Sequence, residues 1–264
     1  MAHPDLESAR LKRDRAHEHI EGLKTEQERW AKAHPEPFTW SLKDDVQPDR
    51  IIGVINTVER PPGYMSTMFG DCIHNLHSSL DHTAWQLFKH GTTPTLKPSQ
   101  EHQIQFPIYN TLDEFNDNLI RRLSMGLRDV HEAIVRRYQP YQRGALAADH
   151  PFAILNRLSR TDKHRNINLT WWCASKATFE VTSRPIGCLI KDMNVLLDLF
   201  DPLDVDTPLF DVVVAGDRTL CRGMEVKTHL TYQISLEKGE WVHDTVSHIK
   251  TMVSDLLAEI DGVL

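Results

Sequence analysis

The chain has 264 residues, of which 25% are charged and 40% are hydrophobic, and its formal net charge is −7. This composition excludes a wholly disordered chain, and the length suffices for a large core without disulfides. No apolar run approaches the roughly 18 residues of a transmembrane helix, and no apolar segment follows the start, so we expect neither a membrane span nor a secretory signal. The four cysteines form no CxxC pair, which predicts a reduced, cytoplasmic protein.

Charge is segregated along the chain. Residues 121–165 hold ten Lys or Arg and four acids, which gives a net charge near +6. Residues 192–217 hold seven Asp and neither Lys nor Arg, which gives a net charge near −7. Two interpretations stay open: two solvated surfaces of opposite sign, or a basic surface for an anionic ligand.

The first two thirds of the chain show mostly helical periodicity, interrupted by one strand pair. The predicted elements are a helix over 5–34, strands over 38–42 and 50–58, a helix over 64–90, a short extended segment over 104–109, and helices over 112–125, 127–138 and 149–163. Prolines and glycines mark most of their ends, as at Pro35 and Gly91.

The last hundred residues change character, because β-forming residues alternate or cluster in short runs. We predict strands over 167–175, 178–183, 210–216 and 229–236, and an amphipathic helix over 241–260. The fold class is therefore α+β: a helical bundle core with an N-terminal hairpin, a C-terminal antiparallel sheet and a closing C-terminal helix. We expect a single domain over 1–264, in which 1–165 is mainly helical and 166–264 forms the sheet and the terminal helix.

The segment over 70–90 reads GDCIHNLHSSLDHTAWQLFKH. On a helical wheel five apolar residues fall within about 80°, and His74, His77 and Asp81 flank this apolar stripe. The spacing lets His77 contact both His74 and Asp81. Titratable groups beside a buried stripe require partners if they are themselves buried.

Three interpretations of this helix compete. In the structural one, Asp71 interacts with the helix N-terminus, and Asp81 fixes a histidine tautomer in the core. In the second, His74, His77 and Asp81 bind a metal together with a ligand from elsewhere. We expect no bound metal, because no fourth ligand is identifiable. In the third, histidine performs acid–base chemistry on a polar or phosphate-bearing substrate.

The segment DKHR, Asp162–Arg165, falls where a helix gives way to a strand. Its cations either neutralise a helix C-terminus or form a charged loop that meets the His77 and Asp81 face. In the second case Lys163, His164 and Arg165 would bind an anion, and Asp162 would support them.

Three segments together resemble a family of uncharacterised bacterial proteins that is common in actinobacteria. They are GDCIHNLHSSLDHTAWQL at 70–87, YQPY at 138–141 and DKHR at 162–165. The family pattern runs GDxxHNLRxxLDH, then QPY, then DKHR. This resemblance implies membership of the family but no particular activity.

A wider similarity is to the HEPN superfamily of helical nucleases and nucleotide-binding proteins, whose mark is an Arg followed after four to six residues by a His. Here His77 stands in place of the arginine and His82 is the histidine. The resemblance implies that His82 is the general acid and base, that protonated His77 binds the phosphate, and that Asp81 orients them. Asp71, His74 and Asn75 would support this site.

We therefore expect a protein that acts on or binds RNA or nucleotides, and the sequence leaves open whether it is an enzyme such as a ribonuclease. HEPN ribonucleases often act across a dimer, so the resemblance also implies a homodimer or a partner protein. No cofactor is expected, because phosphate-binding loops and dinucleotide-binding motifs are lacking. The alternatives are a non-catalytic, partner-binding subunit and a metal-dependent enzyme that uses His74, His77 and Asp81.

Overall fold

A computed structural model of the chain describes residues 3–35, 37–91, 104–122, 127–164, 169–198, 201–236 and 241–264. These residues form two compact units, each assembled from separate parts of the sequence. The helical unit comprises Met1–Thr25, Gly63–Ile167 and His243–Leu264, and the strand unit comprises Glu26–Pro62 and Asn168–Val242. This arrangement differs from the expected single domain with a boundary at residue 165. The terminal helix groups with the early helices, and the early hairpin groups with the late strands.

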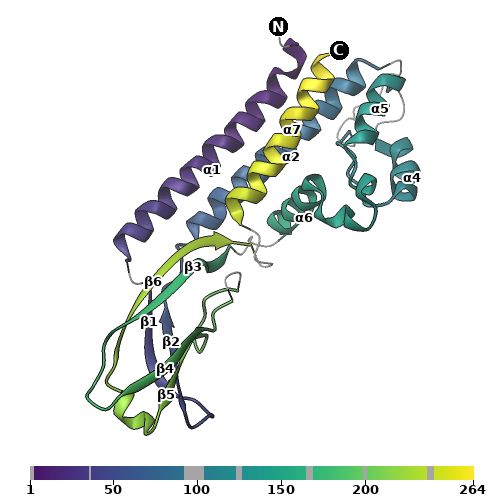
Figure 1. Cartoon of the computed structure of the whole chain (residues 1–264). Coiled ribbons are helices and arrows are strands. Elements are labelled where there is room, and N and C mark those ends of the chain that lie inside the picture. Colours follow the sequence, from purple (N-terminus) through teal and green to yellow (C-terminus); the bar gives the residue numbers. More distant parts are fainter. Residues whose placement is uncertain are drawn as a thin grey trace. The chain divides into compact units, whose positions relative to one another are not determined.

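The helical elements agree closely with those predicted (Figure 1). They are η1 (Pro4–Leu6), α1 (Glu7–Ala33), α2 (Tyr64–Lys89), α4 (Leu112–Arg122), α5 (Asp129–Arg137), η2 (Pro140–Asp149), α6 (Pro151–His164) and α7 (Val242–Asp261). The 3-10 segment η2 was not predicted. The segment over 104–109, named the extended segment after its prediction, belongs to no helix or strand.

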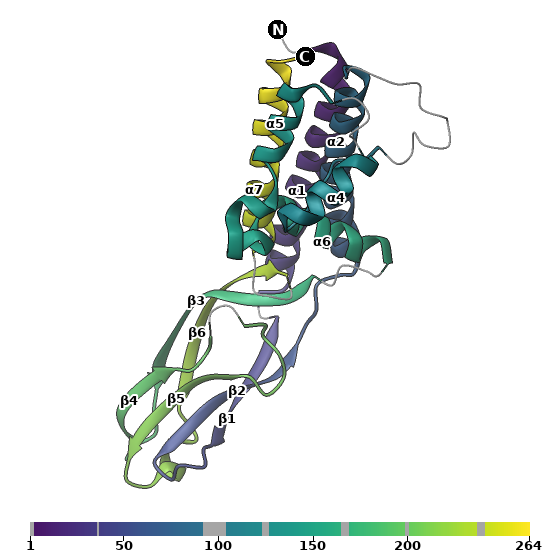
Figure 2. The ribbon, with the colours of Figure 1, turned by 90° about the vertical axis from the view of Figure 1, so that its right-hand side faces the viewer.

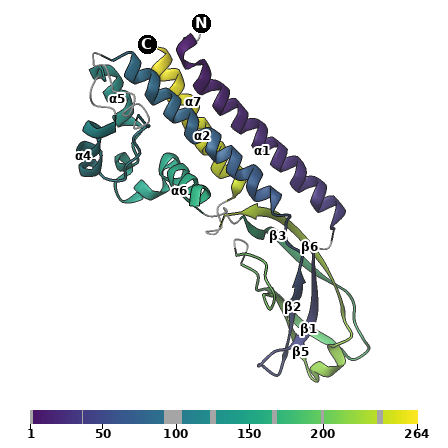
Figure 3. The same cartoon turned by 180° about the vertical axis from the view of Figure 1, so that it is seen from behind.

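The core of the helical unit is the apolar stripe predicted on α2. Its five residues, Ile73, Leu76, Leu80, Ala84 and Leu87, are fully buried. The predicted apolar face of α7 is also buried, and α1, α2 and α7 run side by side in Figures 1 and 3. Helices α4, α5 and α6 lie on the side of α2 that faces the viewer in Figure 2. The helical bundle and the α+β class are thus confirmed.

The strand unit contains two antiparallel sheets. Its strands are β1 (Phe38–Asp44), β2 (Arg50–Val58), β3 (Thr170–Ser183), β4 (Leu189–Val195), β5 (Pro208–Ala215) and β6 (Glu225–Ser235), and η3 covers Arg218–Cys221. The four-stranded sheet has the order β1-β2-β5-β4, and β3 pairs with β6 alone. The hairpin is therefore part of a sheet with late strands, and the two strands predicted over 167–183 form one strand, β3, with a bulge near Ser175.

The expectation of reduced cysteines is wrong for one pair. Cys188 and Cys221 form a disulfide in the strand unit, with Cα atoms 4.9 Å apart. That Cα separation lies within the range that disulfides require. The two cysteines are 33 positions apart in the sequence and form no recognisable motif. Cys72 is a free, buried thiol on α2. Within the described residues, no helix is both long and apolar enough to cross a membrane.

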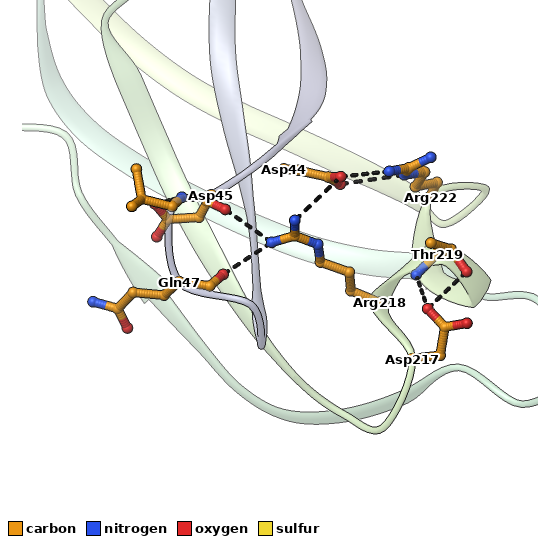
Figure 4. Close-up of polar contacts among 8 residues, drawn as sticks. Asp44, Asp45, Gln47, Asp217, Arg218, Thr219 and Arg222 are labelled. Atoms are coloured by element: carbon orange, nitrogen blue, oxygen red, sulfur yellow. Dashed lines mark hydrogen bonds and ion pairs between the residues drawn. The ribbon is translucent and has the colours of Figure 1, made fainter.

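Charged side chains close one end of the strand unit (Figure 4). Asp44, at the end of β1, pairs with both Arg218 and Arg222. Arg218 also donates to the carbonyl oxygens of Asp45 and Gln47, at 2.8 Å and 3.0 Å. These contacts tie the β1–β2 turn to the segment around η3, far apart in sequence.

Candidate functional site

A pocket of about 820 Å³ lies in the helical unit, between α2, α6 and the extended segment over 104–109. From α2 it is lined by His77, and from the extended segment by residues that include Phe106 and Tyr109. From α6 it is lined by Arg157, Arg160 and Lys163, among others. Its volume falls within the range of roughly 300–1,000 Å³ that is typical of small-molecule sites.

The histidine of the pocket is held by a carboxylate. Nδ1 of His77 lies 3.2 Å from Oδ2 of Asp81, one helical turn later on α2. The other carboxylate oxygen, Oδ1, accepts a hydrogen bond of 3.0 Å from the main-chain N–H of Phe106. The contact of His77 with Asp81 that the spacing predicted is therefore confirmed. Asp81 thereby orients the imidazole and also anchors the extended segment to α2.

The amide of Gln139 anchors the same segment from its other side. Nε2 of Gln139 donates to the carbonyl oxygen of Pro107 at 2.8 Å, and Oε1 accepts from the main-chain N–H of Tyr109 at 3.2 Å. Gln139 is fully buried, so these bonds satisfy a polar group that would otherwise destabilise the fold. Sequence reasoning assigned this glutamine no role, although it belongs to the YQPY segment on which the family resemblance rests.

The cations of the pocket come from successive turns of α6. Arg157, Arg160 and Lys163 are spaced three residues apart, which places neighbouring members on one side of a helix, and all three are exposed. In the part of the chain that the structure describes, Arg160 and Lys163 have no ion-pair partner, and Glu114 is the one acidic residue that lines the pocket. The described lining therefore has an excess of positive charge.

A histidine fixes the start of α6. Nδ1 of the buried His150 accepts a hydrogen bond of 3.1 Å from the main-chain N–H of Phe152, in the first turn. Burial, and to a smaller extent the charge of Arg143, lower the pKa of His150 to about 4. His150 is therefore neutral near pH 7 and can accept this bond. Pro151 is the first residue of α6, which therefore begins two residues later than the predicted start at 149.

The two predicted polar segments meet where α2 packs against α6. A Cβ placed on Gly70 would lie only 2.5 Å from Oδ1 of Asp162. Glycine at 70 therefore allows the Asp162 carboxylate to approach α2. Lys163 of the same segment lines the pocket, but it belongs to the last turn of α6 and not to a charged loop. The side chain of His164 and all of Arg165 lie outside the described residues.

His82 faces another part of the unit. Its Nδ1 is hydrogen-bonded to the hydroxyl of Ser8 on α1 at 2.5 Å, and it does not belong to the described lining of the pocket. Burial, and then the charge of Lys12, lower its pKa. The structure thus does not bring His77 and His82 together, because five residues of helix rotate one from the other by about 140°.

The predicted supporting residues on α2 also lie away from the pocket. Asn75 is buried, donates to the carbonyl oxygen of Asp71 and accepts from Lys12 of α1 at 3.4 Å. His74 and Asp71 are exposed. Because α2 begins at Tyr64, Asp71 is not at the helix N-terminus, contrary to the structural interpretation. Across the described ranges, His74, His77 and Asp81 do not form a cluster with ligand atoms within 4.8 Å of one another.

Comparison of the chain with protein-family models, with curated proteins and with solved structures gives no match. The fold and site therefore define the chain only by class, as an α+β protein with a cation-lined pocket in its helical unit. What the pocket does must be argued from its residues.

Proposed function

We propose that the pocket of the helical unit binds the phosphate groups of a nucleotide or of RNA. One observation carries the proposal. The exposed cations Arg160 and Lys163 line the same pocket as the His77–Asp81 pair, and no described acidic group pairs with either of them. Cations that are paired with acidic groups would serve the fold, whereas cations without an acidic partner suit an anionic ligand.

The residue types fit phosphate. An arginine guanidinium presents parallel N–H donors that match two phosphate oxygens, and a lysine adds a mobile point charge. The neighbouring His164 and Arg165 would supply further cations if they also face the ligand. Phe106 and Tyr109 add aromatic surface to the wall of the pocket, and a base or ribose can pack against such surface.

Acid–base chemistry in this pocket would fall to His77. Asp81 orients its imidazole through Nδ1, which leaves Nε2 for a substrate, the arrangement that general acid–base histidines use. The resemblance to HEPN proteins assigns this role to His82 instead, but His82 contacts Ser8. The proposed catalytic group is therefore His77, with Asp81 as its positioning residue. A cytoplasmic location and action as a homodimer or with a partner protein belong to this proposal as well.

Binding is tested by titrating the full chain with fluorescent adenine and guanine nucleotides and with short single-stranded RNA. The double variant Arg160→Gln, Lys163→Gln should weaken binding at least about tenfold and flatten its salt dependence. The matched control is Arg128→Gln, Lys24→Gln, which removes the same charges from exposed positions outside the pocket lining. Equal binding by both double variants, or no binding by the wild type, would contradict the proposal.

Turnover is tested separately by incubating the wild type with the ligands that bind and measuring products. His77→Gln should abolish product formation and leave ligand affinity within about threefold, if the histidine acts chiefly in proton transfer. Ser8→Ala is the control, because it removes the partner of His82. Loss of turnover in Ser8→Ala but not in His77→Gln would instead assign the chemistry to the His82 side of α2.

A further inference from the structure

Three side chains that the sequence analysis did not single out meet where the chain enters α1 and leaves α2. They are His3, Asp5 of η1, and His90, which follows the last residue of α2. One ligand atom of each lies within 4.8 Å of the other two. All three residues belong to the helical unit and are half-buried, so solvent reaches them.

The geometry is close to that of a metal site. Nε2 of His90 lies 2.5 Å from Oδ2 of Asp5, and Nδ1 of His3 lies 3.9 Å from the same oxygen. Ligands at zinc distances of about 2.0–2.2 Å in a tetrahedral site lie roughly 3.3 Å apart. These separations bracket that value, so shifts of under about 1 Å would bring the atoms to bonding positions. A metal at Nδ1 of His3 would replace a long contact of 3.4 Å from the Asp5 N–H.

The backbone of His3 is held in place by two other helices. Its N–H donates to Oδ1 of Asp261 at the end of α7, and its carbonyl oxygen accepts from Nη1 of Arg10 at 2.8 Å. Arg10 and Asp261 are themselves ion-paired. The first residues of a chain are usually poorly ordered unless they are tied down. Here the hydrogen bonds of the His3 backbone with Asp261 and Arg10 hold the His3 imidazole beside His90. The two rings lie edge to face, with 5.5 Å between their centroids.

We propose that His3, Asp5 and His90 bind one divalent transition-metal ion of the zinc class, with water completing the coordination. Two imidazoles and one carboxylate are a common ligand set for zinc, and three protein ligands plus an accessible position describe an open site. The ion would join the start of the chain to the end of α2. This proposal differs from the sequence-based expectation of no metal, which concerned His74, His77 and Asp81. It is independent of the phosphate-binding proposal, because none of its ligands lines the pocket.

The test uses the full chain without a polyhistidine tag, after dialysis against a chelator. Zinc is titrated by calorimetry, and Co²⁺ is added in a parallel sample to report coordination geometry by visible absorption. We expect one zinc per chain and a tetrahedral or five-coordinate Co²⁺ spectrum. Asp5→Asn and His90→Gln should each weaken zinc binding by more than about tenfold. Zinc should raise the Tm of the wild type and leave that of both variants nearly unchanged.

The matched control is His17→Gln, which removes an exposed histidine of α1 that is outside the cluster. It should bind zinc as the wild type does. Circular dichroism of the two ligand variants checks that they remain folded. Because Asp5 and His90 are substituted in separate variants, one variant still tests the site if the other does not fold. The proposal is overturned if the wild type takes up no zinc at micromolar concentrations. It is also overturned if zinc binding survives both ligand substitutions, or is lost with His74→Gln instead.

Discussion

Two sets of cations, one in each unit of the chain, differ in how their charge is used. In the strand unit, Arg50 pairs with the buried Asp211, and Arg218 and Arg222 share Asp44. In the helical unit, Arg160 and Lys163 line a pocket without an acidic partner among the described residues.

This difference separates a structural from a functional use of charge. A cation paired with a carboxylate holds two distant segments together, and breaking a buried pair leaves an uncompensated charge. Cations without a partner repel one another and add nothing to the stability of the fold. This repulsion is offset only when an anion binds. The stability of the protein should therefore respond differently to substitution of these two sets of cations.

The largest effect is expected at the pair of Arg50 and Asp211, in which the carboxylate is buried and the Arg50 side chain is about one-third exposed. Arg50→Gln leaves the Asp211 carboxylate, 2% exposed, with Asn194 as its remaining side-chain donor. We expect a loss of about 3–5 kcal/mol in the free energy of unfolding, measured by urea denaturation. Adding Asp211→Asn should recover much of the lost free energy of unfolding, because the double variant buries no charge at this position. A single variant as stable as the wild type would show that the pair is not structural.

The disulfide is the second support of the strand unit. Cys188 and Cys221 close a loop with a sequence separation of 33, and the chain-entropy relation predicts about 3–4 kcal/mol of stabilisation for such a loop. Cys221→Ser should therefore lower the free energy of unfolding by about this amount. Adding a reductant should destabilise the wild type to the same extent and leave the variant unchanged. A wild type that is insensitive to reductant would contradict the prediction.

In the helical unit, the scaffold of the pocket depends on a neutral histidine. The pKa of His150 is lowered to about 4 in the folded state, against about 6.5 when unfolded. The unfolded state binds more protons between these values, so stability should fall as the pH decreases from about 6.5 to 4, by up to about 3 kcal/mol.

His150→Asn is the variant that isolates this effect. Asparagine keeps an oxygen that can accept the N–H bond at the start of α6, but it does not titrate. The difference in stability between pH 6.5 and pH 4, measured by denaturant unfolding, should therefore be smaller in the variant. An identical pH dependence in both proteins would exclude His150 as its source.

The smallest effect is expected in the pocket itself. The double variant Arg160→Gln, Lys163→Gln removes two exposed cations that have no ion-pair partner among the described residues. It should change the free energy of unfolding by no more than about 0.5 kcal/mol. A thermal or urea transition of the double variant measures this directly. A loss above about 1 kcal/mol would mean that these cations support the fold, and the contrast between the units would then fail.

The sequence by itself determined the local features of this protein. The apolar stripe of α2 and the ends of most helices follow from periodicity and from proline and glycine positions. The contact between His77 and Asp81 follows from their spacing of four residues on one helix. These properties depend on neighbours along the chain, so a pattern in the sequence contains the necessary information.

Tertiary structure decided everything that depends on distant residues. Strand β4 was missed because it is a largely exposed edge strand without an apolar alternation. The pairing of Cys188 with Cys221, the partner of His82, and the meeting of His3 with His90 all join residues 33 or more positions apart. Whether a polar side chain on α2 faces α1 or the pocket depends on which helices pack on each side, and helix packing is set by the whole assembled core rather than by local spacing.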